Sequence, residues 1–116
     1  MLNFACHSFD IEEVIRCGLA LSKTDYNILN FLIKNKKGLD SKEISKFLKI
    51  DLSTAQRSLK RLRERKLIRR QQINSTTGGY NLFYRSIQKE EISEILQKIV
   101  NIWSKKVKKE LEDWTN

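Results

Sequence analysis

Two short amphipathic patterns that follow each other almost directly, at residues 40–50 and 53–66, constrain the fold of this chain more than any other feature. In each pattern, apolar residues recur at steps of three and four, the spacing that gathers side chains on one face of an α-helix. Only a few residues join the two helices, so we expect them to pack across one another as a helix-turn-helix. The expected inward-facing residues are Ile44, Phe47 and Leu48 in the first helix and Ala55, Leu59 and Leu62 in the second.

Signals for helix ends support these two helices and predict two more before them. A small polar residue followed three positions later by an acid or amide is typical of a helix start. The helix that precedes the pair is expected to end at Gly38, and a shorter one at 8–17 to begin at Ser8 and end at Gly18, because glycine readily closes helices. The capping pairs expected in the other three helices are Ser22–Asp25, Asp40–Glu43 and Ser53–Gln56.

After residue 67 the pattern changes to extended chain. Two runs, 68–73 and 80–87, flank the polar sequence NSTTGG at 74–79. Such runs on either side of a glycine-containing turn predict a β-hairpin, and Leu39 is expected to add a very short strand. The fold class is therefore expected to be mainly α with a small β-hairpin wing, that is, a winged helix-turn-helix.

One long helix is expected from Lys89 onwards, dividing the chain into a winged domain (1–88, including the helix at 8–17) and a C-terminal helix (89–116). Its apolar stripe holds both tryptophans. The stripe could pack back on the winged domain, especially against the helix at 8–17, which would bury Ile92, Ile95 and Ile99, but its far end lies about 39 Å from Lys89 at 1.5 Å per residue. We therefore expect a two-fold homodimer. The expected interface residues are Ile92, Ile95, Leu96, Ile99, Trp103, Val107, Leu111 and Trp114.

Positive charge is concentrated in one segment of the chain. The formal net charge is +9, and residues 53–73 contain eight Lys or Arg side chains against a single acid, Glu64. A local basic patch attracts a polyanion and gains affinity through counterion release. One acid cannot neutralise eight cations, which argues against an ordinary solvated helix face and favours binding to nucleic acid.

The composition excludes several other classes. No proline and only four glycines fit a mostly helical domain, and no run approaches the roughly 20 apolar residues of a membrane span. The N-terminus lacks the features of a secretory signal, so we expect a cytoplasmic protein. With one histidine, no glycine-rich phosphate loop and no evident carboxylate pair, we expect neither an enzyme nor a bound cofactor.

The two cysteines, Cys6 and Cys17, are too few for a disulfide framework. Together with His7 they could supply three ligands of a metal or sensing site. The simpler interpretation is that Cys17 is a small buried residue and that Cys6 lies in a frayed terminus. No metal site is predicted, and a sensing role is left open.

The sequence STAQRSLKRLRERKLIRR, which begins at Ser53, resembles the recognition helix and following strand of MarR-type and TrmB-type regulators. LSKTDYNILNFLIKN, which begins at Leu21, resembles the helix that opens their winged domain. One departure is Lys66, which stands where these families usually have glycine before Leu-Ile. The resemblance implies a dimeric transcription regulator of a short form, without the effector domain of longer TrmB-type proteins, so a small-molecule effector stays unknown.

A recognition helix reads base edges in the major groove of double-stranded DNA through residues near its N-terminus, while flanking groups hold phosphates. Gln56 is suited to adenine and Arg57 or Arg61 to guanine, and the polar hairpin tip is expected to contact the backbone. The alternative is a winged helix that binds RNA or a protein of the transcription machinery. The expected DNA-binding residues are Ser41, Lys42, Ser53, Thr54, Gln56, Arg57, Lys60, Arg61, Arg63, Arg69, Arg70, Asn74, Ser75, Thr76 and Arg85.

Overall fold

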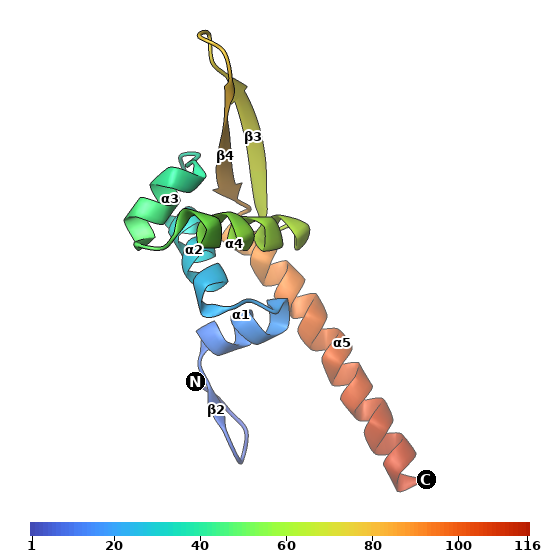
Figure 1. Cartoon of the computed structure of the whole chain (residues 1–116). Coiled ribbons are helices and arrows are strands. Elements are labelled where there is room, and N and C mark those ends of the chain that lie inside the picture. Colours follow the sequence, from blue (N-terminus) through green and yellow to red (C-terminus); the bar gives the residue numbers. More distant parts are fainter.

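The computed structural model describes the whole chain, residues 1–116, as five helices and two small antiparallel hairpins (Figure 1). It measures 70 × 23 × 23 Å with a radius of gyration of 18.0 Å, whereas a compact domain of this length has a radius of about 13 Å. The β3–β4 hairpin and the end of α5 project in opposite directions from a small helical body. The elements are β1 (Leu2–Asn3), β2 (Ser8–Phe9), α1 (Ile11–Leu19), α2 (Lys23–Lys34), α3 (Ser41–Leu48), α4 (Leu52–Glu64), β3 (Ile68–Asn74), β4 (Tyr80–Ser86) and α5 (Lys89–Thr115).

The core lies where α2, α3 and α4 meet the base of the β3–β4 hairpin and the first turn of α5. The predicted inward residues Ala55, Leu59 and Leu62 are all buried on α4, which confirms the helical spacing. The prediction for Phe47 was wrong, because its side chain is 71% exposed. It lies at the rim of the core, with its ring centroid 5.3 Å from that of Phe31.

The predicted wing is present. β3 and β4 pair in register from Ile68 opposite Ser86 to Asn74 opposite Tyr80. Leu39 bridges to Tyr84 as the expected short strand, which joins the wing to the segment between α2 and α3. This winged helix-turn-helix, with a long C-terminal helix, is the predicted fold class.

The helix starts agree with the sequence signals at two of four places. Ser22 with Asp25 and Asp40 with Glu43 each form a reciprocal capping box. The predictions for α4 and α1 were wrong. Helix α4 begins one residue before Ser53, with Asp51 as an N-cap that makes no side-chain hydrogen bond, and the N-cap of α1 is Asp10, whose carboxylate accepts from the Glu13 N–H at 2.8 Å.

The helix ends differ more, because residues other than glycine adopt the left-handed conformation. Ala20, Lys49 and Lys66 have φ values of 55°, 54° and 60° and follow α1, α3 and α4. Helix α2 ends at Lys34, well before Gly38. Gly18 lies inside α1, where an added Cβ would approach Leu96 Cδ2 to 2.8 Å, so glycine at this position permits close packing of α1 on α5.

The N-terminus forms a short hairpin that the sequence did not indicate, with Leu2 opposite Phe9. Phe4 extends from it to Trp103 of α5, with ring centroids 6.5 Å apart in a T-shaped arrangement. Both cysteines are free and exposed, so the expected burial of Cys17 was wrong. No three His, Cys, Asp or Glu side chains converge as metal ligands would, and no helix is both long and apolar enough to cross a membrane.

Candidate nucleic-acid interface

Helix α4 directs its basic side chains to solvent. Gln56, Arg57 and Lys60 are exposed, and Thr54 is half-buried. The Arg57 Nη2 donates to Thr54 Oγ1 at 3.5 Å, a long contact that leaves the guanidinium available. The early turns of α4 therefore present donors and charge at the positions that the sequence predicted.

Arg61 differs from every other cation of this region because it has an acidic partner. Its Nη2 donates to Oδ1 of Asp25 at 2.8 Å, and its Nε lies 3.1 and 3.2 Å from the two carboxylate oxygens. The Arg61 side chain keeps 41% of its exposure, whereas that of Asp25 is only 1% exposed. One nitrogen of the guanidinium, Nη1, is left free to contact a ligand.

Asp25 connects the start of α2 to the recognition helix. Its Oδ2 accepts from the Ser22 backbone N–H at 3.1 Å, and its Oδ1 also accepts from the buried hydroxyl of Ser58. Burial alone would raise the pKa of the Asp25 carboxyl, but hydrogen bonds from Arg61, Ser58 and the Ser22 backbone outweigh burial and hold that pKa below its ordinary value. The ionised carboxylate thus fixes α4 against α2.

The wing adds basic side chains that have no acidic partner. Arg69 and Arg70 on β3 and Arg85 on β4 are exposed, and none of them forms an ion pair, nor do Arg57, Lys60 or Arg63 on α4. Arg69 lies directly across the hairpin from Arg85. Two like charges at such a position repel each other, and an anion bound between them would relieve the repulsion.

The tip of the wing is polar and exposed, as predicted. Asn74, Ser75 and Thr76 are accessible, and the Ser75 and Thr77 hydroxyls are hydrogen-bonded at 2.9 Å. Gly78 and Gly79 supply the positive φ values of 99° and 79° that close the turn. Because the tip has no basic side chain, it can offer hydrogen bonds, but no positive charge, to a nucleic-acid backbone.

At the start of α3, Ser41 is half-exposed and Lys42 exposed. The Asp40 carboxylate already accepts from the N–H of Glu43 at 2.8 Å and brings negative charge to this helix N-terminus. The Lys42 ammonium group, rather than the backbone N–H groups of the helix start, is therefore the group that is free to bind an anion here. None of the fifteen residues expected to bind DNA is buried.

The predicted dimer residues divide into two groups along α5. Ile92 is buried in the core of its own chain, so little of its side chain is left exposed for an interface with a second copy. Ile95, Leu96 and Ile99 are partly buried against the same core, as the alternative of packing on the winged domain predicted. Farther along, Trp103, Val107, Leu111 and Trp114 are 56%, 36%, 53% and 81% exposed.

Sequence reasoning missed Asp25 and Ser58. The capping pattern gave Asp25 a sufficient role at the start of α2, and its partner Arg61 lies 36 residues away. A usable signal was present: Ser58 and Arg61 are three residues apart and lie beside Leu62 on α4. A small hydroxyl and an arginine that border an inward stripe at helical spacing can share a buried acid.

Comparisons with known proteins agree with this geometry. The model of the MarR family matches residues 20–74, from the end of α1 to the end of β3. Two uncharacterised proteins of Methanocaldococcus jannaschii are 26% and 28% identical, over 97% and 87% of this chain and 85% and 82% of their own lengths.

Two solved structures are also similar. A possible transcriptional regulator from Methanosarcina mazei Go1 is 40% identical, with a TM-score of 0.91, over 100% of this chain and 98% of that one. A protein from the thermoacidophilic archaeon Sulfolobus tokodaii shares the fold at 23% identity, with a TM-score of 0.70, over 83% of this chain and 93% of its own. The chain belongs to the MarR family of winged-helix, DNA-binding transcription regulators.

Proposed function

We propose that this regulator binds specific double-stranded DNA sequences as a homodimer, with α4 in the major groove and the β3–β4 wing against the backbone. The observation that carries the proposal is the set of unpaired cations on α4 and the wing. Desolvating them without a partner is costly, whereas DNA phosphates and base acceptors would pair with them. Membership of a family of transcription regulators favours binding over catalysis.

Within this interface we assign base reading to Gln56 and Arg57 on the exposed early turns of α4. Arg57 can donate two parallel hydrogen bonds to guanine, and Gln56 is suited to adenine. Two of the three guanidinium nitrogens of Arg61 are committed to Asp25, so we assign Arg61 mainly to positioning α4. Ser53 and Thr54 at the helix start can add hydroxyl contacts.

We assign phosphate binding to the cations around the reading residues and to the polar wing tip. Charge without a fixed acidic partner suits this role, which positions a protein on the duplex but carries no sequence information. The proposed phosphate-binding residues are Ser41, Lys42, Lys60, Arg63, Arg69, Arg70, Asn74, Ser75, Thr76 and Arg85.

We further propose that residues 1–88 serve DNA binding and that 89–116 serve dimerisation, although α5 begins inside the core of the winged domain through Ile92. The exposed stripe along the rest of α5 supports a second copy, since a contiguous row of large apolar side chains is seldom left in water. A dimer presents two α4 helices to half-sites about one helical turn apart, or a multiple of it.

Selection from a random duplex library, followed by titration of the recovered site, tests this function. We expect one preferred, roughly palindromic sequence and an affinity that falls steeply as salt rises. Replacing both Arg57 and Arg61 with alanine should abolish the preference. Equal affinity of this double variant for the selected site would contradict the proposed docking face, and stronger binding to single-stranded RNA than to the duplex would favour an RNA-binding module.

A further inference from the structure

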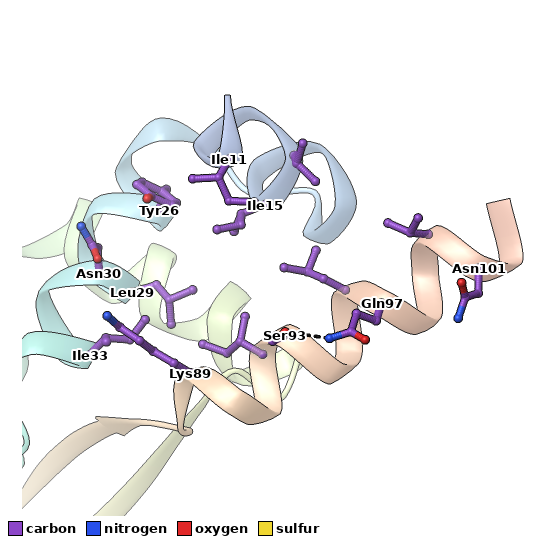
Figure 2. A pocket seen from close by; sticks show the side chains of 14 residues that line it. Ile11, Ile15, Tyr26, Leu29, Asn30, Ile33, Lys89, Ser93, Gln97 and Asn101 are labelled. Atoms are coloured by element: carbon purple, nitrogen blue, oxygen red, sulfur yellow. Dashed lines mark hydrogen bonds between the residues drawn. The ribbon is translucent and has the colours of Figure 1, made fainter. Parts of the chain in front are cut away.

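A polar pocket of about 520 Å³ lies at the base of the wing, where the end of α2, the end of β4 and the start of α5 meet. Only three of the eleven residues that line this wing-base pocket are hydrophobic. It adjoins an apolar cleft between α1, α2 and α5, in which nine of fourteen lining residues are hydrophobic (Figure 2). Ile33 and Lys89 line both spaces, and the Lys89 side chain extends from the start of α5 toward α2. The two neighbouring spaces therefore differ in the kind of ligand that they suit.

Positive charge dominates the wing-base pocket. Four cations line it, Lys34, Lys36, Arg85 and Lys89, against a single acid, Glu90. The four cations are exposed, and none of them forms an ion pair within the chain. Cations held close together repel one another, so a bound anion would lower the free energy of the whole group.

Arg85 lies on the outer face of the wing, which is turned away from α4. Side chains alternate along a strand, and the preceding residue, Tyr84, is buried in the core together with Leu59 of α4. Arg85 therefore takes the opposite face of the hairpin, with Arg69 as its cross-strand neighbour. Gly38 lets the chain pass close beside it, because an added Cβ there would lie 3.3 Å from Arg85 Nε. The pocket is thus separate from the face that the recognition helix presents.

Uncharged hydrogen-bond donors accompany the cations. Gln88 is the N-cap of α5, and its side chain makes no capping hydrogen bond. The N–H groups in the first turn of α5 are therefore without an intrahelical partner. The Ser86 hydroxyl lines the same space. A strand end and a helix start thus supply donors to the space that the cations surround, which suits an anion that can accept several hydrogen bonds.

The size and charge of the wing-base pocket favour a compact phosphorylated molecule. Its volume falls within the range of about 300–1,000 Å³ that is typical of small-molecule sites. Four cations exceed what one carboxylate needs, whereas a phosphate group carries up to about two negative charges and several strong acceptor oxygens. Arginine binds such a group through two parallel hydrogen bonds, and lysine binds it as a point charge. A diphosphate matches this set of cations better than a single phosphate does.

We propose that the wing-base pocket binds a small molecule that carries a diphosphate group, with the cations of α2, β4 and α5 around its phosphoryl oxygens. The site does not depend on homodimerisation. It rests on the proposed function in one respect, because Arg85 is also assigned to a DNA phosphate. A bound diphosphate neutralises Arg85 and so lowers the affinity for DNA, and DNA lowers the affinity for the diphosphate by the same factor.

Isothermal titration of the full chain with inorganic pyrophosphate, in the absence of DNA, tests the site. We expect one binding event per chain, with the largest ¹⁵N NMR amide shifts at residues 86–90. Replacing Lys34 and Lys36 together by glutamine should raise the dissociation constant roughly ten-fold or more. The matched control replaces Lys105 and Lys106, which are exposed on α5 and begin roughly 24 Å along the helix from Lys89. Charges at that distance are largely screened, so the control should bind pyrophosphate like the wild type.

Three results would overturn the site. Equal weakening by the two double variants would mean that net charge alone attracts the anion. Sulfate that binds as tightly as pyrophosphate at the same ionic strength would contradict the assignment to a diphosphate. The absence of heat and of amide shifts with pyrophosphate would also contradict it. If Lys34→Gln with Lys36→Gln then weakened the binding of non-specific duplex DNA, the pocket would belong to the DNA-binding surface instead.

Titration of the selected duplex with and without saturating pyrophosphate, at constant ionic strength, tests the coupling. We expect pyrophosphate to weaken DNA binding and to reduce the salt slope by about one, because one phosphate contact is lost. An unchanged affinity for DNA while pyrophosphate is bound would overturn the coupling and keep the site. A chain that binds pyrophosphate but no duplex would refute the proposed DNA binding and leave the site intact.

Discussion

The winged domain and the outer half of α5 differ in how far their apolar side chains are buried and in which partner their exposed side chains lack. In the winged domain, Ile28, Leu59 and Leu62 are almost fully buried within one chain, and the surface carries unpaired positive charge. The outer half of α5 has no core, since Trp103 and Trp114 are mostly exposed. The first region is complete as a fold and lacks an anion, whereas the second lacks an apolar partner. On the function proposed above, this difference separates a surface that binds DNA from one that binds a second protein chain.

The largest effect is expected where the apolar surface of α5 is broken. Val107→Asp should weaken the dimer at least 100-fold, about 3 kcal/mol, because a carboxylate would have to be buried without a partner. Sedimentation equilibrium measures the change. Lys109→Asp introduces the same side chain on the opposite face of α5 and should have a much smaller effect. Equal effects of the two variants would remove the distinction between the two faces.

The next effect concerns the buried carboxylate inside the winged domain. Asp25→Asn should lower the free energy of unfolding by about 2 kcal/mol, because the guanidinium of Arg61 loses its ionic partner and Ser58 loses a charged acceptor. Thermal or urea unfolding measures the loss, and Asp51→Asn, at a cap without a side-chain hydrogen bond, is the control. Equal unfolding free energies for the wild type and Asp25→Asn would show that the carboxylate does not stabilise the fold.

The same carboxylate predicts how stability depends on pH. Because folding lowers the pKa of Asp25, its contribution is fully present above the ordinary carboxyl pKa of about 3.9 and is lost as the pH falls through the lower folded value. The difference in unfolding free energy between wild type and Asp25→Asn should therefore be constant near neutral pH and shrink below about pH 4. A difference that stays constant down to pH 2 would contradict the direction of the shift.

A smaller effect, on specificity, is expected at Arg57. Arg57→Ala should reduce binding to the selected site by about 1–3 kcal/mol and relax the base preference at one position of each half-site. Lys60→Ala should weaken binding to all sequences about equally and reduce the salt slope by about one. Competition titrations at several salt concentrations separate the two roles, and a uniform loss for both variants would show that Arg57 only binds phosphate.

The smallest effect is expected at Lys66, which follows the end of α4. Lys66 adopts a φ of 60°, a left-handed conformation that is strained for a side chain but not for glycine. Lys66→Gly should stabilise the fold by up to about 1 kcal/mol. Lys60→Gly, at an exposed position in the interior of α4, should instead destabilise it by a similar amount. Destabilisation by both substitutions would indicate that Lys66 makes interactions that outweigh its backbone strain.

Lys66 also illustrates what the sequence could predict. Helix starts at Ser22 and Asp40 followed from side-chain chemistry that is local in the chain, whereas α1 and α4 end near Ala20 and Lys66, non-glycine residues in a left-handed conformation that no local side-chain pattern indicates. The β1–β2 hairpin was missed because strands of two residues are too short to show alternation. For the candidate site, the exposed cations of α4 followed from the apolar stripe of Leu59 and Leu62. The Asp25–Arg61 ion pair could not be predicted from the sequence, because its two residues lie far apart in the chain.

The proposed complex places two α4 helices in the major groove at two half-sites. Methylation interference on the selected duplex tests it most directly, because dimethyl sulfate modifies guanine N7 in the major groove and adenine N3 in the minor groove. We predict interference at guanine N7 in two patches about one helical turn apart, or a multiple of it, with the signal lost in Arg57→Ala. Interference confined to adenine N3, or a single patch that Arg57→Ala leaves intact, would contradict the account.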